Sequence, residues 1–249
     1  MYSTLAQTNQ LIARCECEAV LFDRLCHVAV RYGELRLAWV GRAEAESGYI
    51  KPLARCSASP EFARYLDGLT VHTSETRAEG QGPRGEAWRE GHPVFIQDFR
   101  EDPRMVPWRG SGEAILWGSC AALPLRRGGA VSAVLLLYDT QPWAFSHKVR
   151  DLLERMVVDI EFALDRFDLV AEKERAAAEL RIAALAFEAS GAMLVTDAQG
   201  RILRTNEAAR VSCGYAQQEL IGQELALLLA SDRALPAVAE LFAHVREHG

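Results

Sequence analysis

The feature that most constrains this sequence is a long stretch without helix-breaking residues. Between Ser146 and Ser190 it contains neither glycine nor proline. Ser146 is a favourable first residue for a helix, because its hydroxyl can accept a hydrogen bond from a free backbone N–H. The stretch predicts one helix of about 40 residues, longer than globular domains usually contain. Apolar residues recur along it at the three- and four-residue spacing of one helix face, at Leu153, Met156, Ile160, Ala163, Phe167 and Val170.

This apolar face can have one of two partners. Residues 148–167 carry enough apolar surface to pack on a domain of the same chain. Residues 168–186, which include the run "AEKERAAAELR", are too polar to pack in that way. A coiled coil between two copies of the chain explains this polar part better. We therefore expect a homodimer in which the six apolar residues form a transmission helix, with a connector over 168–188.

The region before the long helix alternates short strand and helix patterns. Gly128-Gly129 lies between two apolar runs and is a strong hairpin signal. The second run, "VSAVLLLYD" at 131–139, is nearly all apolar, which suits a central strand covered on both faces. Further strands are expected over 35–41, 49–56 and 93–97, and helices over 1–17, 18–31, 60–68 and 83–91.

Composition and charge exclude several classes of function. The net charge is −6 and no basic stripe is present, which argues against a nucleic-acid-binding surface. No run approaches the 18 apolar residues of a membrane span. The first residues, "MYSTLAQTNQ", do not have the basic and apolar regions of a secretion signal. We therefore expect a cytoplasmic protein that binds neither membranes nor nucleic acids.

The cysteines do not have metal-ligand spacing. Cys15 and Cys17 form C-x-C rather than C-x-x-C, and no second pair stands at zinc spacing. In a reducing compartment the six cysteines are expected to be free thiols. The sequence therefore predicts no metal site, and no cofactor is expected.

The order of the motifs resembles a GAF domain of bacterial sensory proteins over residues 18–167. The matching segments are "LRLAWVG", "YLDGL", "GQGPRGEAWREGHPVFIQDFREDPRMVPW" and "GSCAALPLRRGGAVSAVLLLYDTQPWAFS". The resemblance implies an α+β fold, in which an antiparallel sheet is flanked by helices. It also implies a ligand cavity between the sheet and residues 83–118.

A second resemblance begins after the long helix. "LVTDAQGRILRTNEAA" and "GYAQQELIGQ" resemble the start of a PAS domain. The chain then ends in "LPAVAELFAHVREHG", which has the pattern of a helix, with no strand pattern after it. We therefore expect an incomplete PAS domain over 189–249.

The implied cavity would be lined by aromatic walls with a few polar anchors, which suits a small organic ligand. An alternative is that the tryptophans are core packing, while Asp98 and Asp102 fix a loop. The candidate ligand-binding residues are Trp39, Trp88, Phe95, Asp98, Arg104, Trp108, Trp117, Cys120 and Tyr138.

The stretch "GQGPRG" at 80–85 matches the G-x-G-x-x-G pattern of dinucleotide-binding sites. Its context argues against that function, because the preceding residues "HTSETRAE" are polar and do not form a buried strand. The helix that starts here could still receive an anion at Arg84 and the free amides.

The resemblances together predict a sensor that is not an enzyme. Ligand or partner binding would shift the closing helix, which passes the change to an output domain for cyclic di-GMP turnover or to a histidine kinase. One alternative is a GAF-type free methionine sulfoxide reductase that uses Cys56 or Cys120. Another is a haem or bilin sensor, for which His72 and His92 are the candidate axial ligands.

Overall fold

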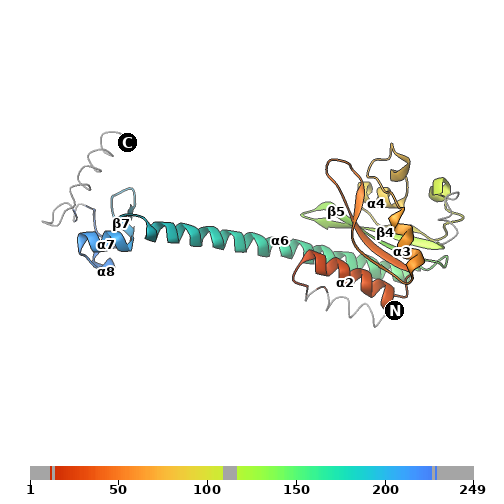
Figure 1. Cartoon of the computed structure of the whole chain (residues 1–249), viewed down its shortest axis with the longest axis horizontal. Helices are drawn as coiled ribbons and strands as arrows, with labels where there is room; N and C mark the ends of the chain where they lie inside the picture. Colours follow the sequence, from red (N-terminus) through yellow and green to blue (C-terminus); the bar gives the residue numbers. More distant parts are fainter. Residues whose placement is uncertain (1–11, 13–14, 109–116, 226–227, 229–249) are drawn as a thin grey trace. The chain divides into compact units, whose positions relative to one another are not determined.

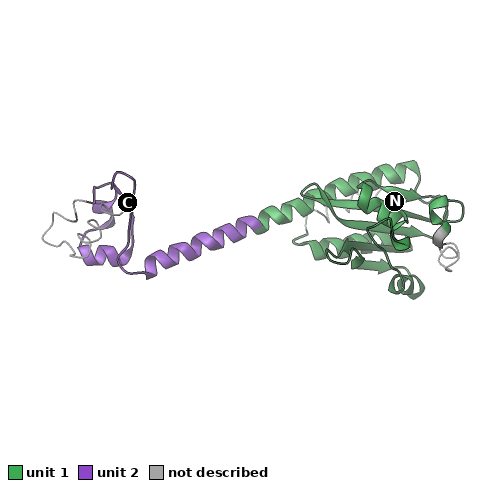
Figure 2. Ribbon diagram, turned by 90° about the horizontal axis from the view of Figure 1, so that it is seen from above, with its two compact units in different colours: residues 1–171 green, residues 172–249 purple. Residues whose placement is uncertain are grey.

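The computed structural model describes residues 12, 15–108, 117–225 and 228, with only the backbone described at 107 and 108. The chain divides into two compact units, residues 1–171 and residues 172–249 (Figure 2). Each unit has its own apolar core. Most of the predicted N-terminal helix over 1–17 and the helix pattern at the C-terminus lie outside the described residues.

The first unit is built on one antiparallel sheet, in the order β2-β1-β5-β4-β3. The almost wholly apolar strand β5 lies at its centre, paired with β1 and β4. The turn between β4 and β5 uses Gly128 and Gly129, whose φ angles of 59° and 83° favour glycine. The strands are β1 (Leu37–Ala43), β2 (Ile50–Ser57), β3 (Val94–Ile96), β4 (Ser119–Arg127) and β5 (Ala130–Asp139). The predicted α+β fold is confirmed.

Helices cover both faces of this sheet (Figure 1). On one face α2 (Glu18–Arg31) and the first half of α6 (His147–Ala189) pack on the strands. The other face carries α3 (Pro60–Asp67) and α4 (Pro83–Glu90), with the short 3₁₀ helices η1 (Ala78–Gly80) and η2 (Pro103–Trp108) in the same part of the chain. Because successive strand residues point to opposite faces, β5 contributes to both cores: Leu135 and Leu137 to one, Leu136 and Tyr138 to the other.

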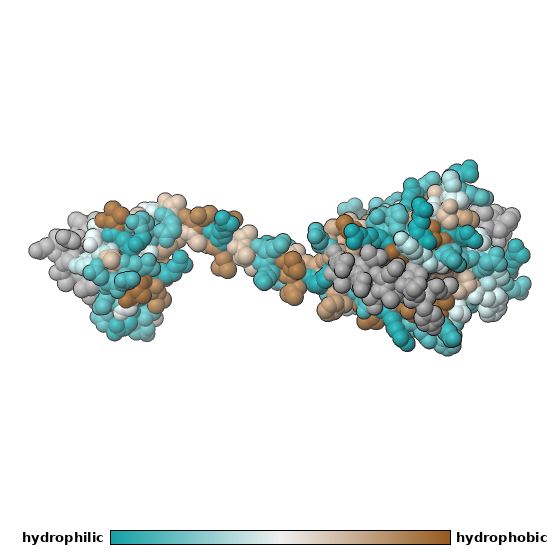
Figure 3. Space-filling view, turned by 90° about the horizontal axis from the view of Figure 1, so that it is seen from below, coloured by the Kyte–Doolittle hydropathy of each residue, from teal (hydrophilic) through white to brown (hydrophobic). Residues whose placement is uncertain are grey.

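The long helix α6 runs unbroken for 43 residues. Leu153, Met156, Ile160 and Ala163 are buried in the core of the first unit, Phe167 is half-buried against it, and Val170 is exposed. The predicted transmission face between Leu153 and Ala163 therefore packs on the chain's own sheet, so it cannot also be the seam of a dimer. Every residue from 168 to 186 is exposed, and apolar and polar surface alternate along this part of the helix (Figure 3).

The β4–β5 hairpin holds α6 close to the point where the helix leaves the first core. The backbone N–H of Arg126 donates to the Glu161 carboxylate at 2.9 Å, and that of Gly128 donates to Asp165 at 2.8 Å. The Arg127 guanidinium pairs with Asp168 at 2.5 Å and also with Glu18 of α2. The tip of the two central strands is thus bonded to the helix.

The second unit contains a small antiparallel pair of strands, β6 (Leu194–Thr196) and β7 (Ile202–Thr205), followed by α7 (Glu207–Cys213) and α8 (Gln217–Leu220). Its core is formed by Ile202, Cys213, Leu220, Leu225 and Leu228. Among the residues described in either unit, no helix has both the length and the apolar composition needed to cross a membrane.

Asn206 is the central polar residue of the second unit and is completely buried. Its side-chain N–H₂ donates to the carbonyls of Phe187 and Gly191 at 2.8 Å, and to that of Ser190 at 3.3 Å. Its side-chain oxygen accepts N–H bonds from Met193 and Ala209, both at 2.9 Å. One amide therefore closes the end of α6, begins β6 and caps α7.

Candidate functional site

Four of the predicted ligand-binding residues meet in the core between the sheet and α3 and α4. Trp39, Trp117, Cys120 and Tyr138 are each at most 2% exposed there. Phe62 and Tyr65 of α3 complete an aromatic group, with ring centroids of Trp117 lying 5.0 Å from Phe62, 5.3 Å from Tyr65 and 5.0 Å from Tyr138. We call the five residues Trp39, Phe62, Tyr65, Trp117 and Tyr138 the aromatic cluster.

Polar atoms inside the aromatic cluster are not all satisfied. The indole Nε1 atoms of Trp39 and Trp117 have no hydrogen-bond partner among the described residues, and both are shielded from solvent. The Tyr138 ring centroid lies 5.8 Å from that of Tyr65, and the Tyr138 hydroxyl is a further buried polar atom without a hydrogen bond of normal geometry to the described residues. Burial raises the pKa of Tyr138 well above its usual value. Such groups are normally paired in a native core, so they indicate a place where a further polar partner would bind.

Arg84 brings a positive charge to the same core. It follows Pro83 at the start of α4, is 3% exposed, and its Nη1 donates to the Tyr65 hydroxyl at 3.3 Å. Arginine is rarely buried to this extent. The glycine-rich pattern indicates Arg84 only as a candidate for anion binding at a helix start, and no predicted ligand residue lies in α3, which carries Phe62 and Tyr65. A signal was present, because the "YLDGL" motif contains Tyr65 and the "GQGPRG" motif contains Arg84.

The remaining predicted ligand residues do not join the aromatic cluster. Trp88 is half-buried at the edge of the same core. Phe95 packs on the opposite face of the sheet, with its ring centroid 6.1 Å from that of Phe145 and with Arg150 over it at 5.0 Å. The side chain of Trp108 lies outside the described residues.

Asp98 and Arg104 fix the loop that follows β3. The Asp98 carboxylate accepts the backbone N–H of Arg100 at 2.8 Å. Asp102 accepts the Arg104 guanidinium at 2.7 and 3.0 Å, and this hydrogen bonding raises the pKa of Arg104. Arg104 also donates to the carbonyl of Phe95 at 3.2 Å. These bonds engage Asp98 within the loop and tie Arg104 to the loop, to β3 and, at 3.6 Å, to Glu86 of α4.

The glycine-rich stretch is explained by close packing of the backbone. It follows the 3₁₀ helix η1 rather than a buried strand, so the context of a dinucleotide site is missing. A Cβ atom at Gly80 would lie 1.9 Å from the carbonyl oxygen of Ser74, and one at Gly85 would lie 2.2 Å from that of Gly80. Only glycine fits where these backbone segments meet.

Among the residues proposed for alternative chemistries, Cys56 and Cys120 have raised pKa values, His72 is fully hydrogen-bonded and His92 is exposed. Burial raises the pKa of Cys120 from 9.0 to about 12, and burial also raises the pKa of Cys56. His72 uses both ring nitrogens, because Nδ1 accepts the N–H of Ser74 at 2.9 Å while Nε2 donates to the carbonyl of Ser47 at 3.0 Å. His92 is exposed and contacts only the neighbouring Pro93 carbonyl among the described residues.

These thiols predict a pH-dependent pattern of alkylation. At neutral pH the folded chain is expected to react with iodoacetamide at the exposed Cys17, while Cys120 stays unmodified until the pH nears 12. In urea Cys120 should react near pH 8.5, the ordinary range of a free thiol. Because the folded state raises the pKa of Cys120, the stability gained from keeping it neutral is present below pH 9.0 and is lost as the pH rises toward 12.

Peptide mass spectrometry of alkylated samples measures the extent of modification at each cysteine separately. Rapid modification of Cys120 in the folded chain at neutral pH would contradict its placement in the core and would favour a reactive thiolate.

Comparison with known families agrees with this architecture. Residues 18–165 match the family described as GAF domain, and residues 181–249 match the PAS fold. No curated protein matches the chain.

Solved GAF structures share the fold at low sequence identity. The free methionine-R-sulfoxide reductase of Neisseria meningitidis, in complex with its substrate, aligns with a TM-score of 0.53 and 14% identity over 67% of this chain and 89% of that chain. The GAF domain of the Acinetobacter phosphoenolpyruvate-protein phosphotransferase aligns with a TM-score of 0.51 and 13% identity, covering 69% and 96%. That of Coxiella burnetii gives 0.52 and 12%, covering 70% and 96%. The GAF match spans more than half of the sequence and a PAS fold follows it, so the chain belongs to the GAF domain family and is a sensory regulatory module.

Proposed function

We propose that this module senses a small molecule at the aromatic cluster and passes the change through α6 to an output domain. The observation that carries this proposal is the position of β4 and β5. Toward one end of the pair, Cys120 and Tyr138 lie in the core of the aromatic cluster. At the other end their hairpin is bonded to Glu161, Asp165 and Asp168 of α6. A shift of these strands would therefore be felt by the helix.

The chemistry of the aromatic cluster favours a flat ligand that carries hydrogen-bond acceptors. Indole N–H groups can only donate, so the Nε1 atoms of Trp39 and Trp117, which have no partner among the described residues, require acceptors. Arg84 adds positive charge from the same side of the sheet. Aromatic side chains favour stacking on a ring. An unsaturated ring compound with carbonyl or carboxylate oxygens satisfies these groups together.

An exposed apolar face that runs along α6 favours a second copy of the chain as its partner. Val158, Phe162 and Leu169 are 63%, 73% and 67% exposed, and their spacing puts them on the face of the helix opposite the buried residues. The same spacing continues in the sequence through Ala176, Leu180 and Ala183. A helix segment without packing partners is marginally stable in water, so residues 168–186 need a partner helix. The same face on a second copy supplies one by pairing as a coiled coil.

We further propose a binding role and not a catalytic one, with an output in cyclic di-GMP turnover or in a histidine kinase. A reductase needs a thiolate, and burial keeps Cys120 neutral. A haem ligand needs a free imidazole nitrogen inside the site. His72 has no free ring nitrogen, and His92 is exposed to solvent. The choice of output depends on the GAF–PAS resemblance alone.

Native mass spectrometry of the purified chain tests sensing and dimerisation in one measurement. The wild type is expected to appear as a dimer that carries a bound small molecule. Trp117→Phe removes one indole N–H but keeps an aromatic ring, so it should lose the small molecule and stay dimeric. Phe162→Glu places charge on the exposed face, so it should weaken the dimer by about 30-fold or more while the small molecule stays bound.

The two variants control each other, because each should remove one property and leave the other. A wild-type chain that is monomeric at micromolar concentration would overturn the dimer. A chain that carries no small molecule from any expression host would count against the aromatic cluster as a sensing site.

A further inference from the structure

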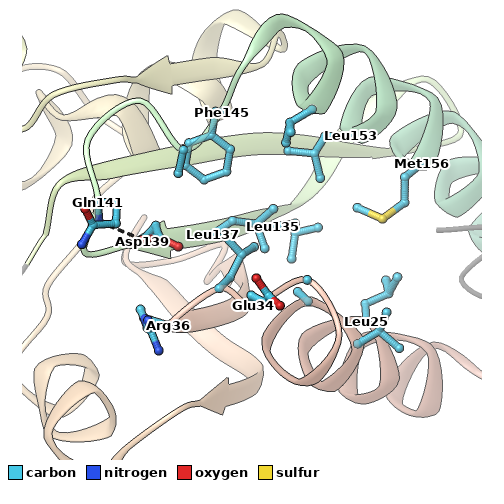
Figure 4. A pocket seen from close by; sticks show the side chains of 16 residues that line it. Leu25, Glu34, Arg36, Leu135, Leu137, Asp139, Gln141, Phe145, Leu153 and Met156 are labelled. Atoms are coloured by element: carbon cyan, nitrogen blue, oxygen red, sulfur yellow. Dashed lines mark hydrogen bonds between the residues drawn. The ribbon is translucent and has the colours of Figure 1, made fainter. Parts of the chain in front are cut away.

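A pocket of about 250 Å³ lies on the opposite face of the sheet from the aromatic cluster. Its walls come from α2, from the segment that links α2 to β1, from β5 and from the start of α6 (Figure 4). Native cores contain few voids larger than a water molecule, so a space of this size is more than a packing defect. It approaches the lower end of the range of small-molecule sites, about 300 Å³.

The interior of this pocket is apolar. Leu135 and Leu137 of β5 form its floor, Leu153 and Met156 of α6 form one side, and Leu25 of α2 lies opposite (Figure 4). All five side chains are buried. An apolar chain or ring that fills this space would displace poorly bonded water and gain the hydrophobic contribution of burial.

Charged and polar side chains gather at one end of the pocket. Arg36, Asp139 and Gln141 lie there, away from Leu25 and Met156, and Glu34 lies between this end and Leu25 (Figure 4). Glu34, Arg36 and Gln141 are exposed, so this end opens to solvent. Neither the Arg36 guanidinium nor the Glu34 carboxylate has a hydrogen-bond or ion-pair partner within the described part of the chain. Asp139 accepts the backbone N–H of Gln141 at 2.8 Å.

Glu34 is held in an unusual backbone conformation at this mouth. Its φ angle is +61°, in the left-handed region that a residue with a Cβ atom adopts at a cost. Strain of this kind is found preferentially at ligand clamps and switch regions. The neighbouring residues Gly33, Leu35 and Arg36 also line the pocket, so the strained residue belongs to its wall.

We propose that this pocket binds a second small molecule, one with an apolar chain and an uncharged amide head group. The amide oxygen accepts from Arg36, and the amide N–H donates to Glu34 or Asp139. A carboxylate head would meet Arg36 but also two carboxylates, and an ammonium head would meet the Arg36 charge. An amide satisfies donors and acceptors of both kinds without adding charge.

This proposal does not rest on the function proposed for the aromatic cluster, because the pocket lies on the other face of β5. The pocket is nevertheless in direct contact with the helix that leaves the unit, since Leu153 and Met156 belong to α6. Binding here would bias the position of α6 without passing through the hairpin.

Two buried methionines allow ligand binding at this pocket to be detected directly. Met156 lines the pocket, whereas Met105 lies in the core of the aromatic cluster. In a full-length chain labelled with ¹³C at its methionine methyl groups, octanamide is expected to shift the Met156 signal and leave that of Met105 in place. Octanoate and octylammonium, with the same chain and charged heads, should bind more weakly by about tenfold.

Matched variants test the apolar tail and the head group of the ligand separately. Ala144→Leu fills the pocket and should abolish the Met156 shift, while Ala171→Leu on the exposed part of α6 should leave it unchanged. Arg36→Gln should weaken octanamide by about tenfold, and Arg31→Gln, outside the pocket, should not. Glu34→Asn removes the carboxylate but suits the left-handed backbone, and it should weaken octanamide as well.

The proposal is overturned if octanamide leaves the Met156 signal unmoved, or if Ala144→Leu binds it as well as the wild type does. Tighter binding of octanoate than of octanamide would overturn the amide head group. A shift of Met105 alone would assign the probe to the aromatic cluster and would also overturn this second site.

Discussion

Ile160→Glu is expected to unfold the first unit, whereas Phe162→Glu, two residues further along the same helix, leaves it folded. Ile160 is completely buried in the core shared by α6, α2 and the sheet, while Phe162 is 73% exposed. A carboxylate at position 160 would be buried without a partner, at a cost of about 4 kcal/mol or more. Domains of this kind have a free energy of unfolding of only about 5–15 kcal/mol.

Urea unfolding followed by tryptophan fluorescence checks this prediction, because all five tryptophans lie within residues 39–143. The midpoint for Phe162→Glu, measured at a concentration where the chain is monomeric, should correspond to a change within about 0.5 kcal/mol. Ile160→Val should cost about 1 kcal/mol, as expected for one methylene in a packed core. Equal destabilisation by both glutamates would show that α6 does not pack through the Ile160 face.

Asn206→Ala is expected to disrupt the second unit and to leave the first unchanged. The substitution leaves the N–H groups of Met193 and Ala209 and the carbonyls at the end of α6 without their partner. Each buried group that loses its bond costs about 1–3 kcal/mol, so the total is expected to be about 3 kcal/mol or more. Hydrogen exchange at Met193 and Ala209 should accelerate accordingly, while the tryptophan-detected unfolding midpoint stays constant.

Asn206→Asp separates the two functions of this side chain. Aspartate still accepts from Ala209, so the amide at the start of α7 should stay protected. It cannot donate to Phe187, Ser190 and Gly191, so protection at the end of α6 should fall. The surface variant Glu207→Ala serves as the control, because it removes only an exposed pair with Arg210. Unchanged exchange at Met193 in Asn206→Ala would refute the central position of Asn206.

The sequence predicted the architecture well where a pattern depends on local chemistry alone. The apolar run of β5, the Gly128-Gly129 turn and the unbroken helix after Ser146 each gave the right element. Periodicity did not reveal the partner of each face of α6. This helix has two apolar faces, and spacing alone does not distinguish the one that packs on the chain's own sheet, around Ile160, from the exposed one around Phe162.

Parts of the candidate site depended on contacts that no local pattern contains. Phe95 lies in a strand of three residues, which is too short for alternation to indicate its face. Arg84 lies in a glycine-rich stretch whose composition is typical of an exposed loop, yet the fold buries its side chain beside Tyr65. The pocket beside Met156 is lined by two stretches that lie about 100 residues apart in the sequence, 25–36 and 135–156, and only the fold brings them together.

The alternating side chains of β5 make one strand a wall both of the pocket beside α6 and of the core around the aromatic cluster. Leu135 and Leu137 face the pocket beside α6, while Leu136 and Tyr138 face the core of the aromatic cluster. A molecule that displaces this strand from one side alters the packing on the other. Thermodynamic linkage then requires the effect to be reciprocal, with each occupant changing the affinity of the other by the same factor. The response of such a unit to two ligands present together would therefore differ from the sum of its responses to each ligand alone.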